Sequence, residues 1–161
     1  MANEERLSAR RVGLIADTHD EIVTWDVLQS KVEAALDDVD LVLHCGDATT
    51  AVVLELLETI APVRAVRSPA DPPAAPPRLS DGPVRLDVDG TILVLSNTRP
   101  DTTEAAVADV VVFGGTHEAV VETVGSVLYV NPGSPSLAER TGVAILDLER
   151  AEPDARIIPI E

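Results

Sequence analysis

The 161-residue chain is poor in several residue types, and each scarcity excludes a class of protein. Its single cysteine, Cys45, allows neither an intramolecular disulfide nor a thiolate zinc site, which favours a reducing cytoplasm. Its only aromatic residues are Trp25, Phe113 and Tyr129, too few for a platform that stacks bases. No apolar run approaches the roughly 18 residues of a membrane-spanning helix, and none follows the charged N-terminal segment. We therefore expect neither secretion nor membrane insertion.

Positive charge is also scarce. Lys31 is the only lysine, and 12 basic residues face 28 acidic ones, for a net charge of −16. Such a chain repels nucleic acid, whose binding requires a basic face. It also repels itself, unless concentrated salt screens the charges over a Debye length of about 3 Å at 1 M. The composition resembles that of halophilic archaeal proteins; an acidic protein from a low-salt organism is the alternative.

The length suits one domain, and we assign residues 1–161 to it. In the first half, short apolar runs alternate with segments of helical periodicity. Strands are predicted at 12–16, 41–43 and 62–66, and helices at 22–36 and after the possible cap Thr50. This β-α-β-α-β order predicts parallel strands joined by right-handed crossovers, hence an α/β fold.

The second half follows a proline-rich loop at 68–83 and consists mainly of strands. One hairpin is predicted at 84–95, turning at Asp89-Gly90, and another at 119–130, turning near Gly125. Single strands are predicted at 110–113, 143–148 and 156–160, with a short helix at 103–107. These strands complete a sheet and do not form a second core.

Residues that can bind metal follow several of the predicted strands. Asp17 and His19 come after the first strand, Asp47 after the second and His117 after a later one. Ligands bind open α/β sheets at the carboxyl ends of their strands. Two carboxylates and two imidazoles form a mixed site suited to Mn, Fe, Zn or Co, which contrasts with the all-oxygen cage of calcium.

Two neighbouring residues are assigned other roles. His44 lies within the second strand and is interpreted as a hydrogen-bonded core residue that supports the site, in preference to a ligand. Cys45 is interpreted as inert packing. The chain lacks the G-x-S-x-G of serine hydrolases, the Walker A loop and G-x-G-x-x-G, so these phosphate and acyl-transfer motifs are excluded.

Four motifs, taken in order, resemble those of the calcineurin-like metallophosphoesterases, in particular their small archaeal and bacterial phosphodiesterase branch. They are Asp17-Thr18-His19, Gly46-Asp47, the G-G-T-H at 114–117 and the N-P-G-S at 131–134. The resemblance implies a two-sheet sandwich flanked by helices, in four layers, and hydrolysis of phosphate esters at a pair of metal ions. The N-P-G-S turn either offers backbone N–H groups to a phosphate or orients His117.

The resemblance assigns the first metal to Asp17, His19, Asp47 and His117, with Asp47 bridging to the second. The positions that would bind only the second metal carry other residues: Ser68-Pro69, Ser96-Asn97 and Gly115. Asp71 retains the acidic end of the third motif. The resemblance thus places catalytic roles on His117, Asp47 and Asp71, around one transition metal, with manganese the first choice.

Two functions follow. One is a phosphoesterase of reduced activity, with an intact first metal site and a weak or absent second, acting on a small phosphate ester. The other is an inactive family member that binds a protein partner as a scaffold, as the retromer subunit with this fold does. The sequence leaves the oligomeric state open.

Overall fold

The computed structural model describes residues 4–19, 25–47, 51–69, 71, 79–101, 105 and 107–160. These residues form two helices and twelve strands. The helices are α1 (Trp25–Ala35) and α2 (Ala51–Leu57). The strands are β1 (Glu4–Leu7), β2 (Arg11–Ile15), β3 (Leu41–His44), β4 (Val63–Val66), β5 (Leu79–Ser80), β6 (Val84–Val88), β7 (Thr91–Ser96), β8 (Val110–Phe113), β9 (Ala119–Val124), β10 (Val127–Pro132), β11 (Gly142–Asp147) and β12 (Asp154–Pro159).

Six strands form sheet I, in the order β12-β11-β2-β3-β4-β5. The strands β2, β3 and β4 are parallel neighbours, as the alternation of apolar runs and helical segments predicts. All four residues of β3 are buried, because this strand is covered on both faces. The chain returns to sheet I at its end, where β11 pairs antiparallel with β2 and β12 with β11.

The other six strands form sheet II, in the order β1-β6-β7-β8-β10-β9. Both predicted hairpins are confirmed: β6 pairs antiparallel with β7 across Asp89-Gly90, and β9 with β10 across Gly125. The strands β7, β8 and β10 are parallel. Their carboxyl ends therefore lie at one edge of the sheet.

The N-terminal strand β1 is absent from the sequence prediction. Its residues are mostly charged and carry no apolar alternation, so their pairing with β6 is decided by tertiary contacts. One such contact is the bidentate pair in which Arg64 donates to Glu5 with N···O distances of 2.8 Å. The 68–83 segment likewise contains the short strand β5. Thr50 and most of the predicted helix at 103–107 lie outside the described residues.

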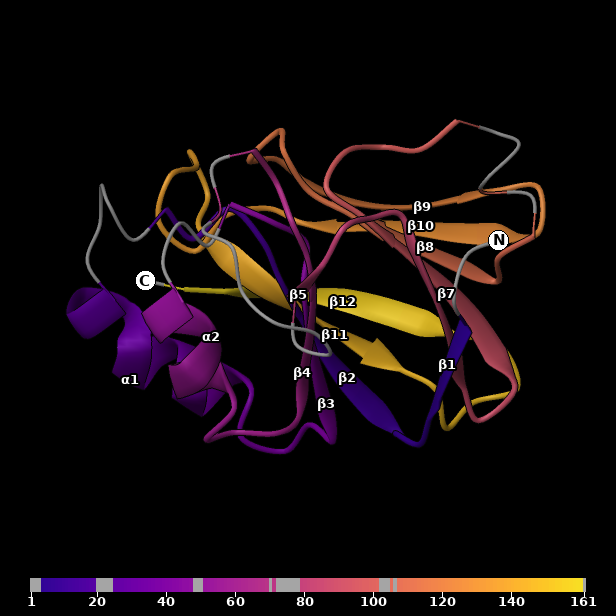
Figure 1. Cartoon of the computed structure of the whole chain (residues 1–161), viewed down its shortest axis with the longest axis horizontal. Coiled ribbons are helices and arrows are strands. Elements are labelled where there is room, and N and C mark those ends of the chain that lie inside the picture. Colours follow the sequence, from indigo (N-terminus) through magenta and orange to yellow (C-terminus); the bar gives the residue numbers. More distant parts are fainter. Residues whose placement is uncertain are drawn as a thin grey trace.

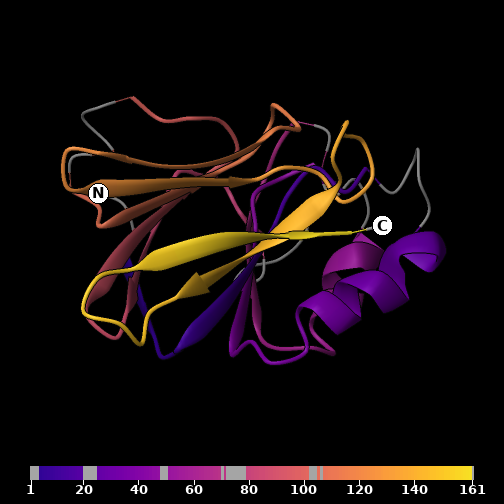
Figure 2. The same ribbon diagram turned by 180° about the vertical axis from the view of Figure 1, so that it is seen from behind.

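The two sheets pack face to face and form a sandwich (Figure 1). Between them lies a core that includes Leu14, Leu43, Leu86 and Val112. The two helices lie together against the outer face of sheet I and bury a second core there. The view from behind shows the end of β12 close to the helices (Figure 2), and Val143, Ile145 and Ile158 of β11 and β12 contribute to this second core. A smaller cluster covers the outer face of sheet II and includes Ala105. The predicted sandwich is confirmed.

The helices α1 and α2 have 11 and 7 residues. Neither is long and apolar enough to cross a membrane.

Candidate metal centre

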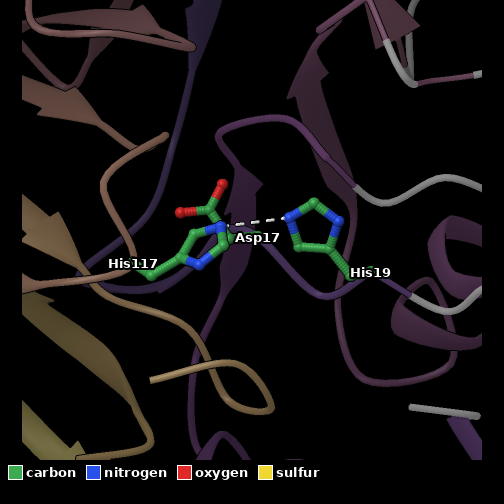
Figure 3. Close-up of side chains that lie close together, drawn as sticks. All are labelled: Asp17, His19 and His117. Carbon is green, nitrogen blue, oxygen red and sulfur yellow. Dashed lines mark hydrogen bonds between the residues drawn. The ribbon is translucent and has the colours of Figure 1, made fainter. Parts of the chain in front are cut away.

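Three of the predicted ligands meet where the two sheets approach each other. Asp17 and His19 follow β2 of sheet I, and His117 follows β8 of sheet II. One donor atom from each residue lies within 4.8 Å of the others (Figure 3). The Nε2 atoms of His19 and His117 are 3.2 Å apart. Two nitrogens bound about 2.1 Å from a tetrahedral ion would be about 3.4 Å apart, so this spacing suits a shared cation.

The backbone of this centre is unusual. Five described residues other than glycine have positive φ, and one of them, Asp89, belongs to a hairpin turn. The other four are Asp17 (53°), His19 (45°), Asp47 (58°) and His117 (63°). Left-handed conformations cost energy in L-residues and cluster at functional sites. This strain therefore falls on the four residues that the sequence singles out as ligands.

Asp17 connects the two sheets. It is fully buried, and its carboxylate accepts the N–H of Gly115, 3.0 Å from Oδ2. A Cβ on the preceding Gly114 would lie 2.9 Å from Ala16 Cβ, so only glycine allows the strand ends to come this close. Burial raises the pKa of Asp17 to about 7, and the Gly115 N–H partly opposes this shift, while Asp47 adds to it. The site thus favours a bound positive charge beside Asp17.

Asp47 lies next to the triad. Its Oδ2 is 3.8 Å from His19 Nε2, and its Oδ1 accepts a hydrogen bond from the Ser68 hydroxyl. Asp71 supports this arrangement, because its Oδ2 accepts the backbone N–H groups of Asp47 and Ser68, each at 3.0 Å. The structure therefore brings all four predicted ligands together. The hydrogen bonds of Asp71 thus join Asp47, after β3, to Ser68, after β4.

His44 connects the two loops that carry Asp17 and Asp47. Its Nδ1 accepts the N–H of Gly46 at 3.1 Å, so the proton of the neutral ring is on Nε2. This Nε2–H donates to Thr18 Oγ1 at 3.1 Å. Full burial lowers the pKa of His44 to about 4, which keeps the ring neutral. His44 is thus a supporting residue, as predicted.

The N-P-G-S turn holds the ligand loops from the other side. Ser134 Oγ donates to the carbonyl of Asp17 at 2.7 Å, and Asn131 Nδ2 donates to Thr116 Oγ1 at 3.0 Å. Of the two roles left open by the sequence, these contacts correspond to orientation of the His117 loop. Ser136, which the motif analysis missed, donates to the carbonyl of Thr18 at 2.8 Å. The sequence feature that could have pointed to Ser136 is its position as a second serine just after the N-P-G-S turn.

Cys45 takes no part in this chemistry. It is fully buried, and burial raises the pKa of its thiol well above the usual value. The thiol stays protonated and packs between the sheets, as predicted.

The donor set and the fold together match a known family. The model of the calcineurin-like phosphoesterase superfamily domain matches residues 11–151. The chain belongs to this superfamily. A probable metallophosphoesterase of Methanothermobacter thermautotrophicus is 31% identical over 157 residues, covering 91% of each chain. A phosphodiesterase of Methanocaldococcus jannaschii is 26% identical, over 88% of this chain and 95% of its own.

Solved structures of other proteins share the fold. A novel archaeal phosphodiesterase superposes with a TM-score of 0.73 at 24% identity, over 92% of this chain and 99% of its own. Vps29 from Entamoeba histolytica, in complex with zinc, superposes with a TM-score of 0.63 at 17% identity, over 94% and 99%. The two-sheet metallophosphoesterase sandwich is thus confirmed.

Proposed function

We propose that this protein is a metal-dependent phosphodiesterase that works with one tightly held transition metal. The observation that supports this most is the cluster of Asp17, His19 and His117, formed by two sheets and strained at each residue. Relatives described as a metallophosphoesterase and a phosphodiesterase cover nearly the whole chain. The substrate is then a small phosphate ester.

The residues present fit such an ion. Asp17, His19 and His117 would hold it, and Asp47 lies beside His19 to complete the set. One carboxylate with two imidazoles suits manganese first, and zinc, iron or cobalt as alternatives. When bound, the ion supplies a Lewis acid that polarises a phosphoryl oxygen and acidifies water. The raised pKa of Asp17 is consistent with this, because a nearby cation relieves the cost of burying its charge.

In our proposal, the chain binds a second metal ion only weakly. The Oδ1 of Asp47 is occupied by the Ser68 hydroxyl. At Gly115, φ is +94°, and a Cβ would lie 3.0 Å from the carbonyl oxygen of Asn97. Any side chain larger than that of glycine therefore fits here only if the backbone shifts. A single ion stabilises fewer of the reacting oxygens than a pair does, so we expect reduced turnover.

The chain's own residues have distinct roles in this proposal. His117 and Asp47 would lie beside the reacting group, and with Nε2 of His117 on the ion its ring can hold or release a proton only at Nδ1. Asp71 keeps Asp47 in place through the backbone N–H that it accepts. A scaffold that binds a protein partner and no longer hydrolyses esters is the second candidate. The Ser68 contact with Asp47 favours it, since this contact occupies an oxygen that would otherwise be open to a second metal ion.

Hydrolysis decides between these two candidates. With bis-p-nitrophenyl phosphate and manganese at neutral pH, we expect slow turnover that falls by at least about 100-fold in His117→Ala, because a ligand of the ion is lost. The matched control is Glu118→Ala, which changes the exposed neighbouring residue. Release of p-nitrophenol is followed at 405 nm, an approximate maximum of the free phenolate. Turnover that survives in His117→Ala contradicts the assignment, and no turnover in the wild type supports the scaffold.

We also propose a salt-rich, reducing cytoplasm as the working environment. The net charge of −16 and the single lysine support this. Cys45 is buried and reduced.

Stability should then rise with salt. Screening weakens the repulsion among 28 carboxylates, and salting-out strengthens burial of a core made of short aliphatic side chains. We expect the midpoint of thermal unfolding to increase by about 10 °C or more between 0.1 and 3 M potassium chloride, with metal content fixed, which corresponds to a few kcal/mol. A midpoint that stays flat or falls contradicts the halophilic interpretation.

A further inference from the structure

The strand β9 forms an open edge of sheet II. It is the last strand in the order β1-β6-β7-β8-β10-β9, and among the described residues no strand pairs with its other side. Nearly all of its side chains are exposed, including Val121 (42%) and Val124 (51%). A strand edge with unpaired backbone groups and exposed valines is a template on which another strand can pair.

Every second residue of β9 directs its backbone groups away from the sheet. Leu128 in β10 donates its N–H to the carbonyl of Asp109, just before β8, so the backbone groups of Leu128 point away from β9. These groups alternate in direction along a strand, so those of the next residue, Tyr129, point towards its partner Glu122 in β9. Glu122 therefore bonds to β10, and its neighbours do not. The residues of β9 whose N–H and C=O groups point outward are Ala119, Val121 and Thr123.

The other three sheet edges are protected against such pairing. The strand β1 is mostly charged, and β5 has only two residues. The strand β12 carries Asp154 and Arg156 and ends at Pro159. Charge, proline and shortness are common devices that keep strand edges unpaired. The strand β9 contains no proline and no basic residue, and its one acidic residue, Glu122, is paired with Arg99 at 2.6 Å.

The sequence of β9 is complementary to itself in one antiparallel register. When Val121 lies opposite Val121 of a second copy, Ala119 lies opposite Thr123, and all the outward groups meet in about six hydrogen bonds. Glu122 then lies opposite Val120, so no carboxylate directly faces another. The next registers that keep the outward groups facing each other place Glu122 opposite Glu122 or Glu118, and directly opposed like charges are destabilising.

Charge also favours β9 as the place where two copies approach. Each copy carries a net charge of −16, so two copies repel each other at acidic surfaces. At β9 the carboxylate of Glu122 is compensated by the guanidinium of Arg99, which lies 4.4 Å from the centre of the Tyr129 ring. Concentrated salt screens the charges elsewhere on the surface. The contact should therefore strengthen as salt is added.

We propose that β9 pairs antiparallel with β9 of a second copy of this chain, about a two-fold axis at Val121. The two copies of sheet II then form one continuous sheet. The paired edge is about 20 Å long, which makes a small interface and a dimer that dissociates in the micromolar range. The strand begins at Ala119, just after the turn that carries His117, so the interface adjoins the candidate metal centre. The proposal does not depend on the phosphodiesterase function.

The molar mass in solution tests the association, by sedimentation equilibrium on the full chain. We expect at least about half of the chains to be dimeric at about 100 µM in 2 M potassium chloride, and the Kd to be at least about tenfold higher in 0.1 M. Val121→Pro should be monomeric, because it removes the central outward N–H and leaves the bonds to β10 in place. Val121→Lys should also be monomeric, since two ammonium groups would meet at the axis.

The matched control is Val52→Lys, which makes the same change at a valine of α2 that is 52% exposed. It should dimerise like the wild type. Both lysine variants have one negative charge less in total, so a loss of dimer in Val121→Lys alone cannot come from net charge. A wild type that stays monomeric in 2 M potassium chloride overturns the proposal, and so does a dimer that both Val121 variants leave intact.

Disulfide crosslinking tests the register. In the proposed dimer, cysteines at position 121 would have Cα atoms about 5.5 Å apart, within reach of a disulfide. Cysteines at position 123 would be about 13 Å apart, which is too far. We expect oxidised glutathione to link Val121→Cys into a dimer on a non-reducing gel and to leave Thr123→Cys unlinked. A mixture of Ala119→Cys and Thr123→Cys should give a linked heterodimer.

The native Cys45 is fully buried and should not react in any of these proteins. No linked dimer in Val121→Cys, or equal linking in Val121→Cys and Thr123→Cys, overturns the proposed pairing.

Discussion

Replacing Asp17 by asparagine is expected to abolish metal retention and, at the same time, to stabilise the metal-free protein at pH 8. The carboxylate supplies the negative charge of the triad, and the amide that replaces it is a poor ligand. The amide oxygen can still accept the N–H of Gly115, so the connection between the sheets survives. What is removed is a buried group that ionises only at a cost.

The sign of the stability effect follows from the direction of the pKa shift. The pKa of Asp17 is raised from 3.8 to about 7 in the folded state, mainly by burial. The folded state therefore prefers the protonated acid, and the penalty for ionisation grows as the pH rises from about 4 to 7. Above pH 7 the penalty is complete and amounts to at most about 4 kcal/mol. Asparagine pays no such penalty, so its advantage is largest at pH 8 and small at pH 4.

Two measurements check this prediction. Elemental analysis after manganese loading and desalting should find about one ion per wild-type chain and none in Asp17→Asn. Urea unfolding in EDTA should give a higher free energy of unfolding for the variant at pH 8, with a smaller difference at pH 5. Asp37→Asn, which removes a carboxylate from an exposed turn, is the control and should keep the ion. Two retained ions in the wild type, or a less stable variant at pH 8, contradict the account.

Replacing His44 by asparagine is expected to destabilise the protein by about 2–3 kcal/mol at pH 7, and much less at pH 4.5. The asparagine oxygen can accept the N–H of Gly46, but the hydrogen bond to Thr18 and part of the ring's packing are lost. The pH dependence has a separate origin. The pKa of His44 is lowered from 6.5 to about 4 by burial, so its neutral form stabilises the fold fully above pH 6.5. That contribution is lost as the pH falls towards 4, by about 2 kcal/mol between pH 7 and 4.5.

The difference between wild type and variant isolates this contribution. Asp17 titrates over the same range with the opposite sign, so the wild type alone shows little net change from the two groups. Both proteins keep Asp17, and subtraction of their free energies of unfolding in EDTA removes its effect. A destabilisation that is equal at pH 7 and pH 4.5 would show that His44 does not stay neutral in the fold. Retained manganese per chain should also fall, because His44 connects the loops that carry Asp17 and Asp47.

Most strands could be predicted from the sequence, because their patterning is local. The run before Asp17 and the hairpin at Asp89-Gly90 carry signals within a few residues, and the structure has β2, β6 and β7 there. The strand β1 carries no such signal. Its charged residues extend sheet II because the edge of β6 is open for pairing and because Arg64 donates hydrogen bonds to the carboxylate of Glu5.

The candidate site was predicted less completely. The four candidate ligands could be found because each follows an apolar strand, and parallel strands end at one edge. His44 could be assigned a supporting role, but the contact partners within the site could not. Thr18 contacts His44, and Ser68 contacts Asp47, across 26 and 21 positions of sequence, with no periodicity that relates the partners. The cavity of about 350 Å³ between the end of β4, the start of β6 and the segment after β7 likewise depends on how these strands approach one another.

The sequence by itself determined which side chains follow the strands, two carboxylates and two imidazoles, and the acidic composition of the chain. Only the tertiary structure decided that Asp17 and His117 come from different sheets, that their backbones are strained, and that Asp17 has a pKa of about 7. The physical reason is that strand patterning acts over a few residues. Burial, charge coupling and backbone strain depend on which distant segments pack together, and that is settled when the two sheets close on their common core.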